Sequence, residues 1–544
     1  MKKTIHLLLL MYIVCFYKAS LWGQGQQVKQ QFIVSFANSR SVAEDKKNAE
    51  GFAINHNVAI NELDKLTCIP FTYLWELRGN LNDVIATAEY IKKRPNGSNR
   101  AVDTTYNNPI QYRLSPLSCS VSKDSIDAYP SCAIGGDKPV LIAVIDDGMG
   151  DYFRSGRTQV DYRTFFKPHL WTHPTTGSIG YNFLNNTPSP INSQAKHGSA
   201  VTYRIVDMLK KAKVEKVQIM ALQTHDPETG LGTLWNVCRA LDFACYHKVN
   251  IINMSLAGLT SPNSSGEVEA VGTSALEVII EYMRTKNILV VAAAGNDGEN
   301  VTQPRLDNKR YCTASYKLLN LIEVAANARC SDALWSFSNR GAPNVHIAAP
   351  GENVYCAVPI EVNASGFMNL TGTSFAAPHV TAAAAILAAN RPTMAFSYLP
   401  IVRSLIDPTT VTRVAQLEKL ISSTGRLNTC KALKYFLQNY ERLNGIMSFN
   451  TEGSISQPPL STNAIKISPN PTNADLNIQL KSTQNADTYL ILTDILGRVT
   501  LQQEWSIHIG DNVQFVDLSN LNKGVYFINI RIGTETLIHK VIKN

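Results

Sequence analysis

The stretch TGTSFAAPHV, residues 371–380, places a serine between a Gly-Thr turn and a run of small residues. Ser374 has two interpretations. Serine often caps a helix, and Ala-Ala-Pro is ordinary material for a helix opening. Alternatively, Ser374 is a nucleophile, because Gly372 permits a sharp turn and a helix N-terminus presents N–H groups to developing negative charge. In the second case the small residues would let a peptide approach the hydroxyl. That interpretation requires a base, an acid that orients the base, and an oxyanion donor.

Two histidines are candidates for the base. His379 lies five residues after Ser374, roughly 140° around a regular helix, so it cannot face the hydroxyl. His197 opens a second predicted helix, and Gly198 beside it leaves room for a substrate backbone. A plain surface histidine at a helix start is the alternative. The helix is supported by an apolar stripe at Val201, Ile205, Met208, Leu209 and Ala212.

The orienting acid is expected in VLIAVIDDG, residues 140–148, where Asp146 and Asp147 end an apolar strand. Ligand sites of parallel sheets lie at the carboxyl ends of strands. Successive strand residues face opposite ways, so only one of these carboxylates can point at the imidazole. The alternative is a simple Asp-Gly turn.

The oxyanion donor is expected in ILVVAAAGNDG, residues 288–298, where Gly295 and Asn296 follow another apolar strand. An asparagine amide can bind developing negative charge on oxygen, and the glycine lets substrate approach. Asn-Asp-Gly is equally a turn sequence. Asp297 beside the amide hints at a preference for basic residues before the scissile bond.

The elements that must position these residues follow a regular order. From Val140 to about Gly445, short apolar runs alternate with longer helical stretches, which predicts a doubly wound α/β domain with a parallel sheet. Residues 31–104 show strand and helix patterns typical of a small α+β domain. Residues 446–464 are poor in apolar periodicity and predict a linker. Residues 465–544 alternate as strands do and predict a β-sandwich.

Taken together and in chain order, IAVIDDG, HGSAV, INMSLAG, AAAGNDG and GTSFAAPHV resemble the motifs of the subtilisin-like (S8) serine peptidases over roughly residues 106–445. The resemblance implies that Ser374 is the nucleophile, His197 the general base and then acid, and Asp146 the orienting carboxylate. Asn296 and the backbone N–H of Ser374 would hold the oxyanion. Substrate-binding positions implied by the same motifs are Ser255, Leu256, Ala257 and Gly295.

The chain departs from the family pattern in two motifs. The histidine motif usually continues Gly-Thr-His-Val, but residues 198–201 read Gly-Ser-Ala-Val, and Ala257 replaces a glycine in the substrate-strand motif. These changes bear on substrate preference rather than on the triad. The chemistry needs no cofactor and no metal. Family members often bind structural calcium, but the sequence contains no contiguous calcium loop.

The regions on either side resemble accessory parts of secreted peptidases. By position and element order, residues 24–105 resemble the inhibitory, folding-assisting prosegment of the family, which makes the chain a zymogen cut between about 100 and 118. Near the C-terminus, ISPNPTNADLNIQL, DILGR, DLSNLNKGVYFINI and HKVIKN resemble the type IX secretion sorting domain. The alternative for residues 465–544 is a sandwich that binds carbohydrate or protein.

Composition and the N-terminus bear on localisation. Two lysines precede an apolar stretch from Ile5 to Tyr17, which predicts a signal peptide over residues 1–23. About 13 apolar residues are too few to span a bilayer, so no transmembrane span is expected in the mature chain. The net charge of +8, without basic runs interleaved with aromatics, gives no support for nucleic-acid binding.

Ten cysteines suit an exported protein. Cys15 lies in the predicted signal peptide and Cys68 in the predicted prosegment, which leaves eight for up to four disulfides. Proximity suggests pairs of Cys119 with Cys132 and of Cys312 with Cys330, although eight cysteines allow 105 pairings.

The sequence thus predicts a serine endopeptidase that acts on protein or peptide substrates through an acyl-enzyme. We expect it to cross the periplasm of a Gram-negative bacterium, engage the secretion machinery through residues 465–544, and be secreted or attached to the cell surface. The alternative is a catalytically silent adhesin or binding protein on a peptidase scaffold.

Overall fold

The computed structural model describes most of the chain. The predicted signal peptide, the linker residues 446–463, Cys119, Ala257, Cys312 and Cys330 lie outside the described residues. No helix in the described part is both long and apolar enough to cross a membrane. The described residues are 27–38, 42–69, 72–92, 99–104, 113–114, 132, 135–155, 158–256, 275–303, 311, 313–328, 333–444, 464–469, 472, 475–482, 485–494, 499–519, 521–532 and 535–544.

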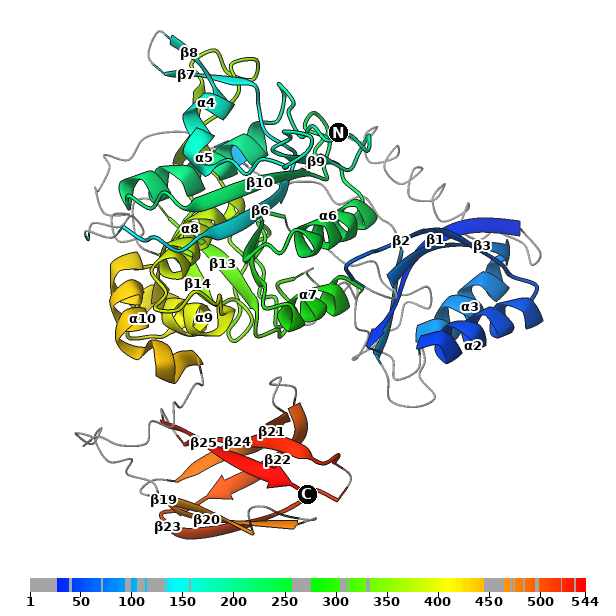
Figure 1. Cartoon of the computed structure of the whole chain (residues 1–544), viewed down its shortest axis with the longest axis vertical. Coiled ribbons are helices and arrows are strands. Elements are labelled where there is room, and N and C mark those ends of the chain that lie inside the picture. The colour runs from blue at the N-terminus through cyan, green and yellow to red at the C-terminus, as the bar shows by residue number, and fades with distance from the viewer. Residues whose placement is uncertain are drawn as a thin grey trace, which may run out of the picture. The chain divides into compact units, whose positions relative to one another are not determined.

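The chain divides into two compact units, Met1–Met447 and Ser448–Asn544. The first unit holds a small N-terminal domain and a large α/β domain, and the second is all β (Figure 1). The predicted border between prosegment and peptidase domain falls within the first unit and stays a prediction.

A nine-stranded sheet forms the centre of the α/β domain. Its seven principal strands pair in parallel, and their near-continuous apolar sequences are buried on both faces, as expected for such a sheet. At one edge β18 joins in parallel and β17 pairs antiparallel to it. In spatial order the strands are β17 (Thr412–Arg413), β18 (Gly425–Arg426), β14 (Ile347–Pro350), β13 (Leu321–Asn327), β12 (Leu289–Ala293), β11 (Ile251–Met254), β6 (Val140–Asp146), β10 (Val217–Gln223) and β9 (Gly180–Asn182).

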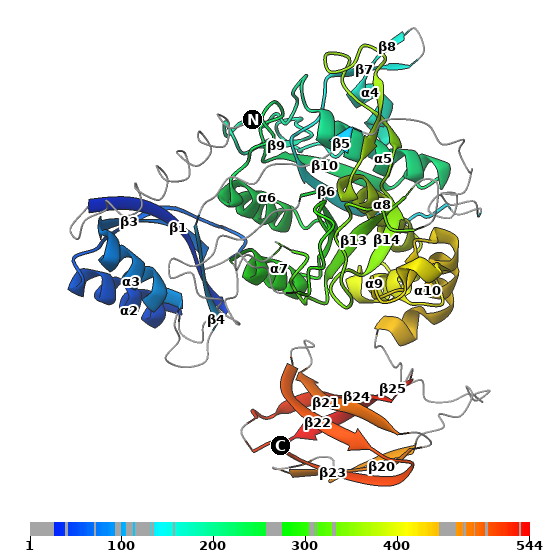
Figure 2. The same cartoon turned by 180° about the vertical axis from the view of Figure 1, so that it is seen from behind.

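Helices cover both faces of this sheet and create two hydrophobic cores (Figures 1 and 2). This arrangement confirms the predicted doubly wound α/β fold. One core contains α5 (Lys196–Lys211), α8 (Thr373–Ala389), α9 (Tyr398–Ile406) and α10 (Thr429–Asn444). The other contains α6 (Leu234–Tyr246) and α7 (Ala275–Thr285).

Shorter elements lie outside the central sheet. A three-stranded sheet has the order β15-β16-β5, and β16 leads directly into α8. The bounds of the short elements are β5 (Arg113–Leu114), β7 (Tyr152–Ser155), β8 (Thr158–Asp161), α4 (Tyr162–Phe166), η2 (Lys167–His169), β15 (Val354–Ala357), β16 (Phe367–Thr371) and η3 (Ala415–Leu417).

The N-terminal domain is a four-stranded sheet of order β2-β3-β1-β4 with two helices. Alternation along the strands separates its two faces: Val34 and Trp75 pack in the domain's own core, whereas Ile33 and Leu74 pack with α6 and α7. The predicted small α+β domain is therefore confirmed. Strand β2 was not predicted, because it is largely exposed and its sequence shows no apolar alternation. Its elements are β1 (Gln27–Asn38), α2 (Val42–Asn55), β2 (Ala59–Lys65), β3 (Thr72–Asn80), α3 (Leu81–Lys92) and β4 (Asn99–Thr104).

The second unit is the predicted β-sandwich. Two sheets, of order β19-β20-β23 and β22-β21-β24-β25, share one apolar core that includes Trp505 and Leu492. The strands are β19 (Ala464–Ser468), β20 (Asp475–Ser482), β21 (Ala486–Asp494), β22 (Val499–Ile507), β23 (Gly510–Asp517), β24 (Gly524–Ile532) and β25 (Glu535–Lys543).

The disulfides differ from the pairing suggested by proximity. Cys132 pairs with Cys430, not with Cys119, and Cys68 pairs with Cys245. Sequence separations of 298 and 177 residues explain why adjacency in the chain was a poor guide. The prediction that Cys68 is not among the cysteines that form disulfides with the peptidase domain is therefore wrong.

Candidate active site

Three neighbouring strands of the central sheet, β6, β11 and β12, bring the predicted polar residues to one edge. Asp146 is the last residue of β6, Ser255 follows β11, and Asn296 follows β12 shortly after its end. Because the strands are parallel, their carboxyl ends meet at the same edge. β6 lies between β10 and β11, where chain connections leave in both directions, and sites of α/β proteins gather at such switch points.

Asp146 and His197 form a buried pair. Asp146 Oδ1 lies 2.7 Å from His197 Nδ1, and each residue is only 1% exposed. Burial lowers the pKa of His197, but the charge and hydrogen bond of Asp146 outweigh this effect, so the pKa is raised above its ordinary 6.5. The backbone N–H of Asp147 also donates to Asp146 Oδ1 at 2.8 Å. The carboxylate is thus fixed toward the imidazole.

The second carboxylate, Asp147, holds the start of α5. Its Oδ2 accepts the backbone N–H of His197 at 3.0 Å, and its Oδ1 accepts that of Gly198 at 2.7 Å. A carboxylate at a helix N-terminus satisfies N–H groups that have no partner within the helix. Burial, followed by the neighbouring charge of Asp146, raises the pKa of Asp147 to about 7.

The structure gives Gly198 a different role from the predicted one. A Cβ at this position would lie 2.2 Å from the Gly148 carbonyl oxygen and 2.9 Å from Asp147 Oδ1. The missing side chain therefore lets α5 approach the end of β6, so the space serves the chain's own loop. The predicted apolar stripe of α5 is buried in the core beneath.

Ser374 is the second residue of α8 and is 3% exposed. Its Oγ donates to the Ser255 carbonyl oxygen at 3.0 Å, while Ser255 Oγ donates to the Ser374 carbonyl oxygen at 2.8 Å. His197 lies beside the next residue of α8, with 5.2 Å between its ring centroid and that of Phe375. The residue that follows Ser374 along α8 is thus in contact with the imidazole of the Asp146–His197 pair.

Asn296 is held from the helix that carries the serine. Its Oδ1 accepts two hydrogen bonds from Thr373, from the backbone N–H at 2.8 Å and from Oγ1 at 2.8 Å. Since a backbone N–H can only donate, the amide oxygen must face Thr373. Gly372 has φ 155°, and a Cβ there would lie 3.3 Å from Asn296 Nδ2. Only glycine suits that conformation, and its missing side chain avoids this close contact with the amide.

The small residues after Ser374 were expected to admit a peptide, but the structure places them elsewhere. Ala376 and Ala377 are fully buried, and every residue of α8 is buried. Their small size allows close packing of α8 in the core between the sheet and α5. His379, rejected as the base, accordingly points back to its own helix, with Nδ1 2.8 Å from the Phe375 carbonyl oxygen.

The predicted substrate-binding residues show mixed placements. Leu256 packs its side chain into the core beside α6 and α7. The N–H of Gly295 donates to Thr373 Oγ1 at 3.1 Å, and its carbonyl accepts the Asn339 N–H at 2.9 Å, so both groups serve the site's framework. Ser255 contacts Ser374 directly. A direct substrate contact by any of these residues stays a prediction.

The sequence analysis did not predict the role of Thr373 or the hydrogen bonds that hold Ser255 in place. Asn253 Nδ2 donates to Ser255 Oγ at 3.0 Å, and Thr381 Oγ1 donates to Asn253 Oδ1 at 2.7 Å. A threonine next to the serine, and an asparagine inside an otherwise apolar strand, were the available signals. In the part of the chain that is described, no three His, Cys, Asp or Glu residues gather as a metal site. Structural calcium stays an open prediction.

Comparison with known proteins agrees with this arrangement. Residues 137–422 match the family described as "Subtilase family", and residues 466–544 match "Secretion system C-terminal sorting domain". Thermitase of Thermoactinomyces vulgaris is 33% identical over 218 residues, 39% of this chain and 67% of that protein. The thermophilic serine proteinase of Bacillus sp. (strain AK1) is 31% identical over 258 residues, 46% of this chain and 52% of that protein. The chain thus spans about half to two thirds of these relatives.

Solved structures give further likenesses. The prenylagaramide maturation protease PagA is 23% identical, with a TM-score of 0.38 over 55% of this chain and 95% of that one. A chain of the subtilase cytotoxin SubAB assembly is 19% identical, with a TM-score of 0.42 over 60% of this chain and 96% of that one. The family match covers more than half of the residues and includes every part of the site described above. The chain belongs to the subtilase family and carries a secretion-system sorting domain at its C-terminal end.

Proposed function

We propose that this protein is a secreted serine endopeptidase that hydrolyses peptide bonds through an acyl-enzyme on Ser374. The observation that carries the proposal is the buried Asp146–His197 pair, with 2.7 Å between Oδ1 and Nδ1, beside the helix whose second residue is Ser374. A purely structural histidine would not need a buried carboxylate at its Nδ1, because an ion pair of this kind costs desolvation.

In the proposed reaction, His197 takes the proton of Ser374 as Oγ attacks the substrate carbonyl carbon. The Asp146 carboxylate keeps Nδ1 protonated and stabilises the imidazolium that forms. Ser374 Oγ must first leave the Ser255 carbonyl oxygen to which it donates here. Rotation about one side-chain bond achieves this, and catalytic hydrogen bonds commonly tighten only when substrate is bound. His197 then protonates the leaving amine, and water hydrolyses the acyl-enzyme.

The oxyanion is assigned to Asn296 Nδ2 and the backbone N–H of Ser374. The fixed orientation of the amide supports this assignment, because its oxygen is occupied by Thr373. Donors that are already oriented need no reorganisation when charge develops on the substrate oxygen.

We assign the N-terminal domain the role of prosegment and the β-sandwich the role of secretion signal. The sandwich is a separate compact unit, and all residues assigned to the reaction lie in the other unit. The protein would pass through the periplasm of a Gram-negative cell and reach the medium or the cell surface. Protein and peptide substrates follow from the proposed reaction. A preference for basic residues before the scissile bond, suggested by the exposed Asp297, stays a prediction.

A fluorophosphonate probe tests the proposal, because only an activated serine reacts with it. We expect the processed wild-type protein to be labelled, and Ser374→Ala to remain unlabelled. Ser365→Ala is the matched control, since Ser365 lies in an exposed turn shortly before β16 and should leave labelling intact. A folded, processed wild-type protein that takes no label would instead support the adhesin alternative.

A further inference from the structure

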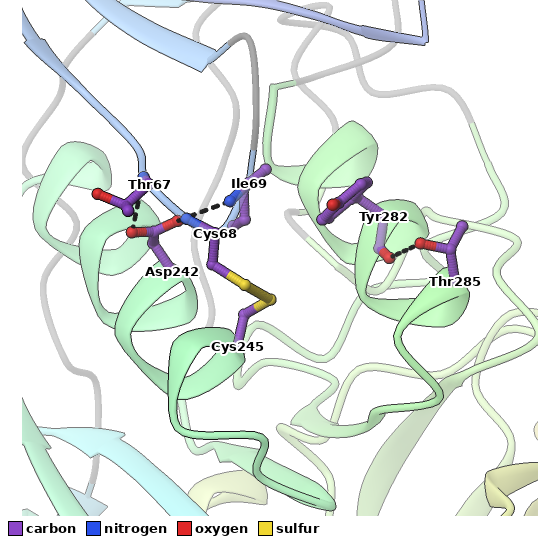
Figure 3. Close-up of a disulfide and its surroundings, with 7 residues drawn as sticks. All are labelled: Thr67, Cys68, Ile69, Asp242, Cys245, Tyr282 and Thr285. Atoms are coloured by element: carbon purple, nitrogen blue, oxygen red, sulfur yellow. Dashed lines mark hydrogen bonds between the residues drawn. A yellow bond between two sulfur atoms is a disulfide. The ribbon is translucent and has the colours of Figure 1, made fainter.

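A disulfide joins the N-terminal domain to the α/β domain. Cys68 lies in the loop between β2 and β3, and Cys245 lies near the end of α6 (Figure 3). Their Cα atoms are 6.0 Å apart, within the usual range for a disulfide. Any cut between residues 100 and 118, where maturation is expected, falls between these two cysteines in the chain. The two pieces would still be one covalent molecule.

Polar contacts hold the same loop against α6. The Asp242 carboxylate accepts three successive backbone N–H groups, from Thr67 at 3.0 Å, Cys68 at 2.6 Å and Ile69 at 2.7 Å (Figure 3). Asp242 lies three residues before Cys245, so both face the loop from one side of the helix. Charge-assisted hydrogen bonds of this kind are among the stronger ones in proteins.

Apolar packing continues the contact across the sheet of the N-terminal domain. Ile33, Leu66, Ile69 and Leu74 are at most 8% exposed and share a hydrophobic core with residues of α6 and α7. Departure of the domain would expose this apolar face together with the helix residues beneath it. Large exposed apolar patches are unusual on soluble proteins.

β5 lies within the expected cut region, residues 100–118, and pairs with the strand that precedes Ser374. Arg113 and Leu114 pair antiparallel with Thr371 and Leu370, the last residues of the strand that leads into Ser374. Arg113 and Leu114 themselves therefore lie beside the strand that leads to the proposed nucleophile.

We propose that maturation produces a two-chain enzyme in which the N-terminal domain remains attached through Cys68–Cys245 and serves as a permanent cover for α6 and α7. The inference rests on the proposed function, which supplies the cut. Cutting alone cannot release the domain. Release requires a dithiol, whose thiolate attacks the disulfide and whose second thiol resolves the mixed disulfide. The dithiol is oxidised to a disulfide by two electrons, and Cys68 and Cys245 become thiols.

The tether can be tested without relying on the protein's own activity. A recognition sequence for a site-specific protease is inserted between residues 104 and 113 of the full-length Ser374→Ala variant. After cutting and blocking of thiols with iodoacetamide, we expect one full-length band on a denaturing gel without reductant and two bands after dithiothreitol. Wild-type protein that processes itself should behave in the same way. Two bands without reductant would overturn the inference.

Two double variants identify the responsible disulfide. Cys68→Ser/Cys245→Ser should give two bands with or without reductant. Cys132→Ser/Cys430→Ser is the matched control, because both cysteines follow the cut, and it should still give one band without reductant. Should the first variant fail to fold, a non-reduced digest of wild-type protein must contain the peptides of Cys68 and Cys245 linked together, and unlinked peptides would refute the tether. The protein with the inserted site could give one band without reductant while the wild-type protein is never processed. That result would refute autocatalytic maturation but would support the disulfide link between the two pieces.

Discussion

Asn296 and Thr373 should act as one unit in catalysis, and a pair of substitutions can show this. Asn296→Leu removes the proposed oxyanion donor at similar volume. Loss of the corresponding donor in subtilisin lowers kcat by about 10²–10³, and we expect a similar fall here with little change in KM. The bond forms to the oxyanion rather than to the ground-state carbonyl, so binding is spared. A tenfold rise in KM at unchanged kcat would assign Asn296 to ground-state binding instead.

Thr373→Val removes only the hydroxyl that helps to orient this amide. The 2.8 Å bond from Thr373 Oγ1 to Asn296 Oδ1 is lost, while the bond from the backbone N–H remains. A net hydrogen bond contributes about 0.5–1.5 kcal/mol, which corresponds to a fall in kcat of roughly two- to tenfold. The N–H of Gly295, which also uses Oγ1, loses its partner, so the free energy of unfolding should fall by about 1–3 kcal/mol.

The double variant distinguishes orientation from an independent effect. If Thr373 acts on kcat only through Asn296, then Asn296→Leu/Thr373→Val should have the kcat of Asn296→Leu within about twofold. Steady-state rates on one peptide substrate give the cycle, and Thr373→Ser, which keeps the hydroxyl, should retain wild-type kcat. A further tenfold loss in the double variant would refute the reasoning.

The remaining predictions concern processing, export and pH. Ser374→Ala should lower kcat by about 10⁶, the size seen in subtilisin, and leave residues 31–104 uncut, which a gel would show as a longer chain; a processed but inactive variant would assign processing to another protease. Deletion of residues 465–544 should leave an active peptidase in the periplasm, and its appearance in the medium would contradict the sorting role. The base must be neutral to accept a proton, and the pKa of His197 is raised, so kcat/KM should fall as pH drops through a value above 6.5. Asp147→Asn should lower kcat more than KM rises, because it replaces one of the two carboxylate oxygens that accept the helix N–H groups by an NH2 group that can only donate; unchanged kcat would exclude a positioning role.

The sequence predicted the fold, and it placed the proposed site residues at the ends of elements, because both depend on local patterns. Buried parallel strands leave continuous apolar runs, such as residues 140–145 and 289–293, and both lie in strands of the structure. Asp146, Asn296 and Ser374 lie at strand or helix ends, where a polar residue interrupts an apolar pattern. Such interruptions can be recognised in the sequence alone.

The features that escaped prediction depend on contacts between distant residues. The two observed disulfides close loops of 177 and 298 residues, and no local sequence pattern predicts such pairings. Gly198 looked like an opening for substrate, but its neighbour in space is the loop after β6, about fifty residues earlier in the chain. A missing side chain in a sequence shows that space is needed there, but only the structure shows which group fills it.

The small residues after Ser374 follow the same logic and explain how the site is held. α8 is buried along its whole length, so it can pass through the core only with small side chains against the sheet and α5. Its first two residues then carry both the proposed nucleophile and Thr373, which orients Asn296. α5, packed against α8, carries His197. The proposed nucleophile and base are therefore positioned by the contact between α8 and α5, and the proposed oxyanion donor is oriented from the start of α8. Ala383 lies deep in α8 and is fully buried. A larger side chain at this position would overpack the core and would therefore disturb all three groups together.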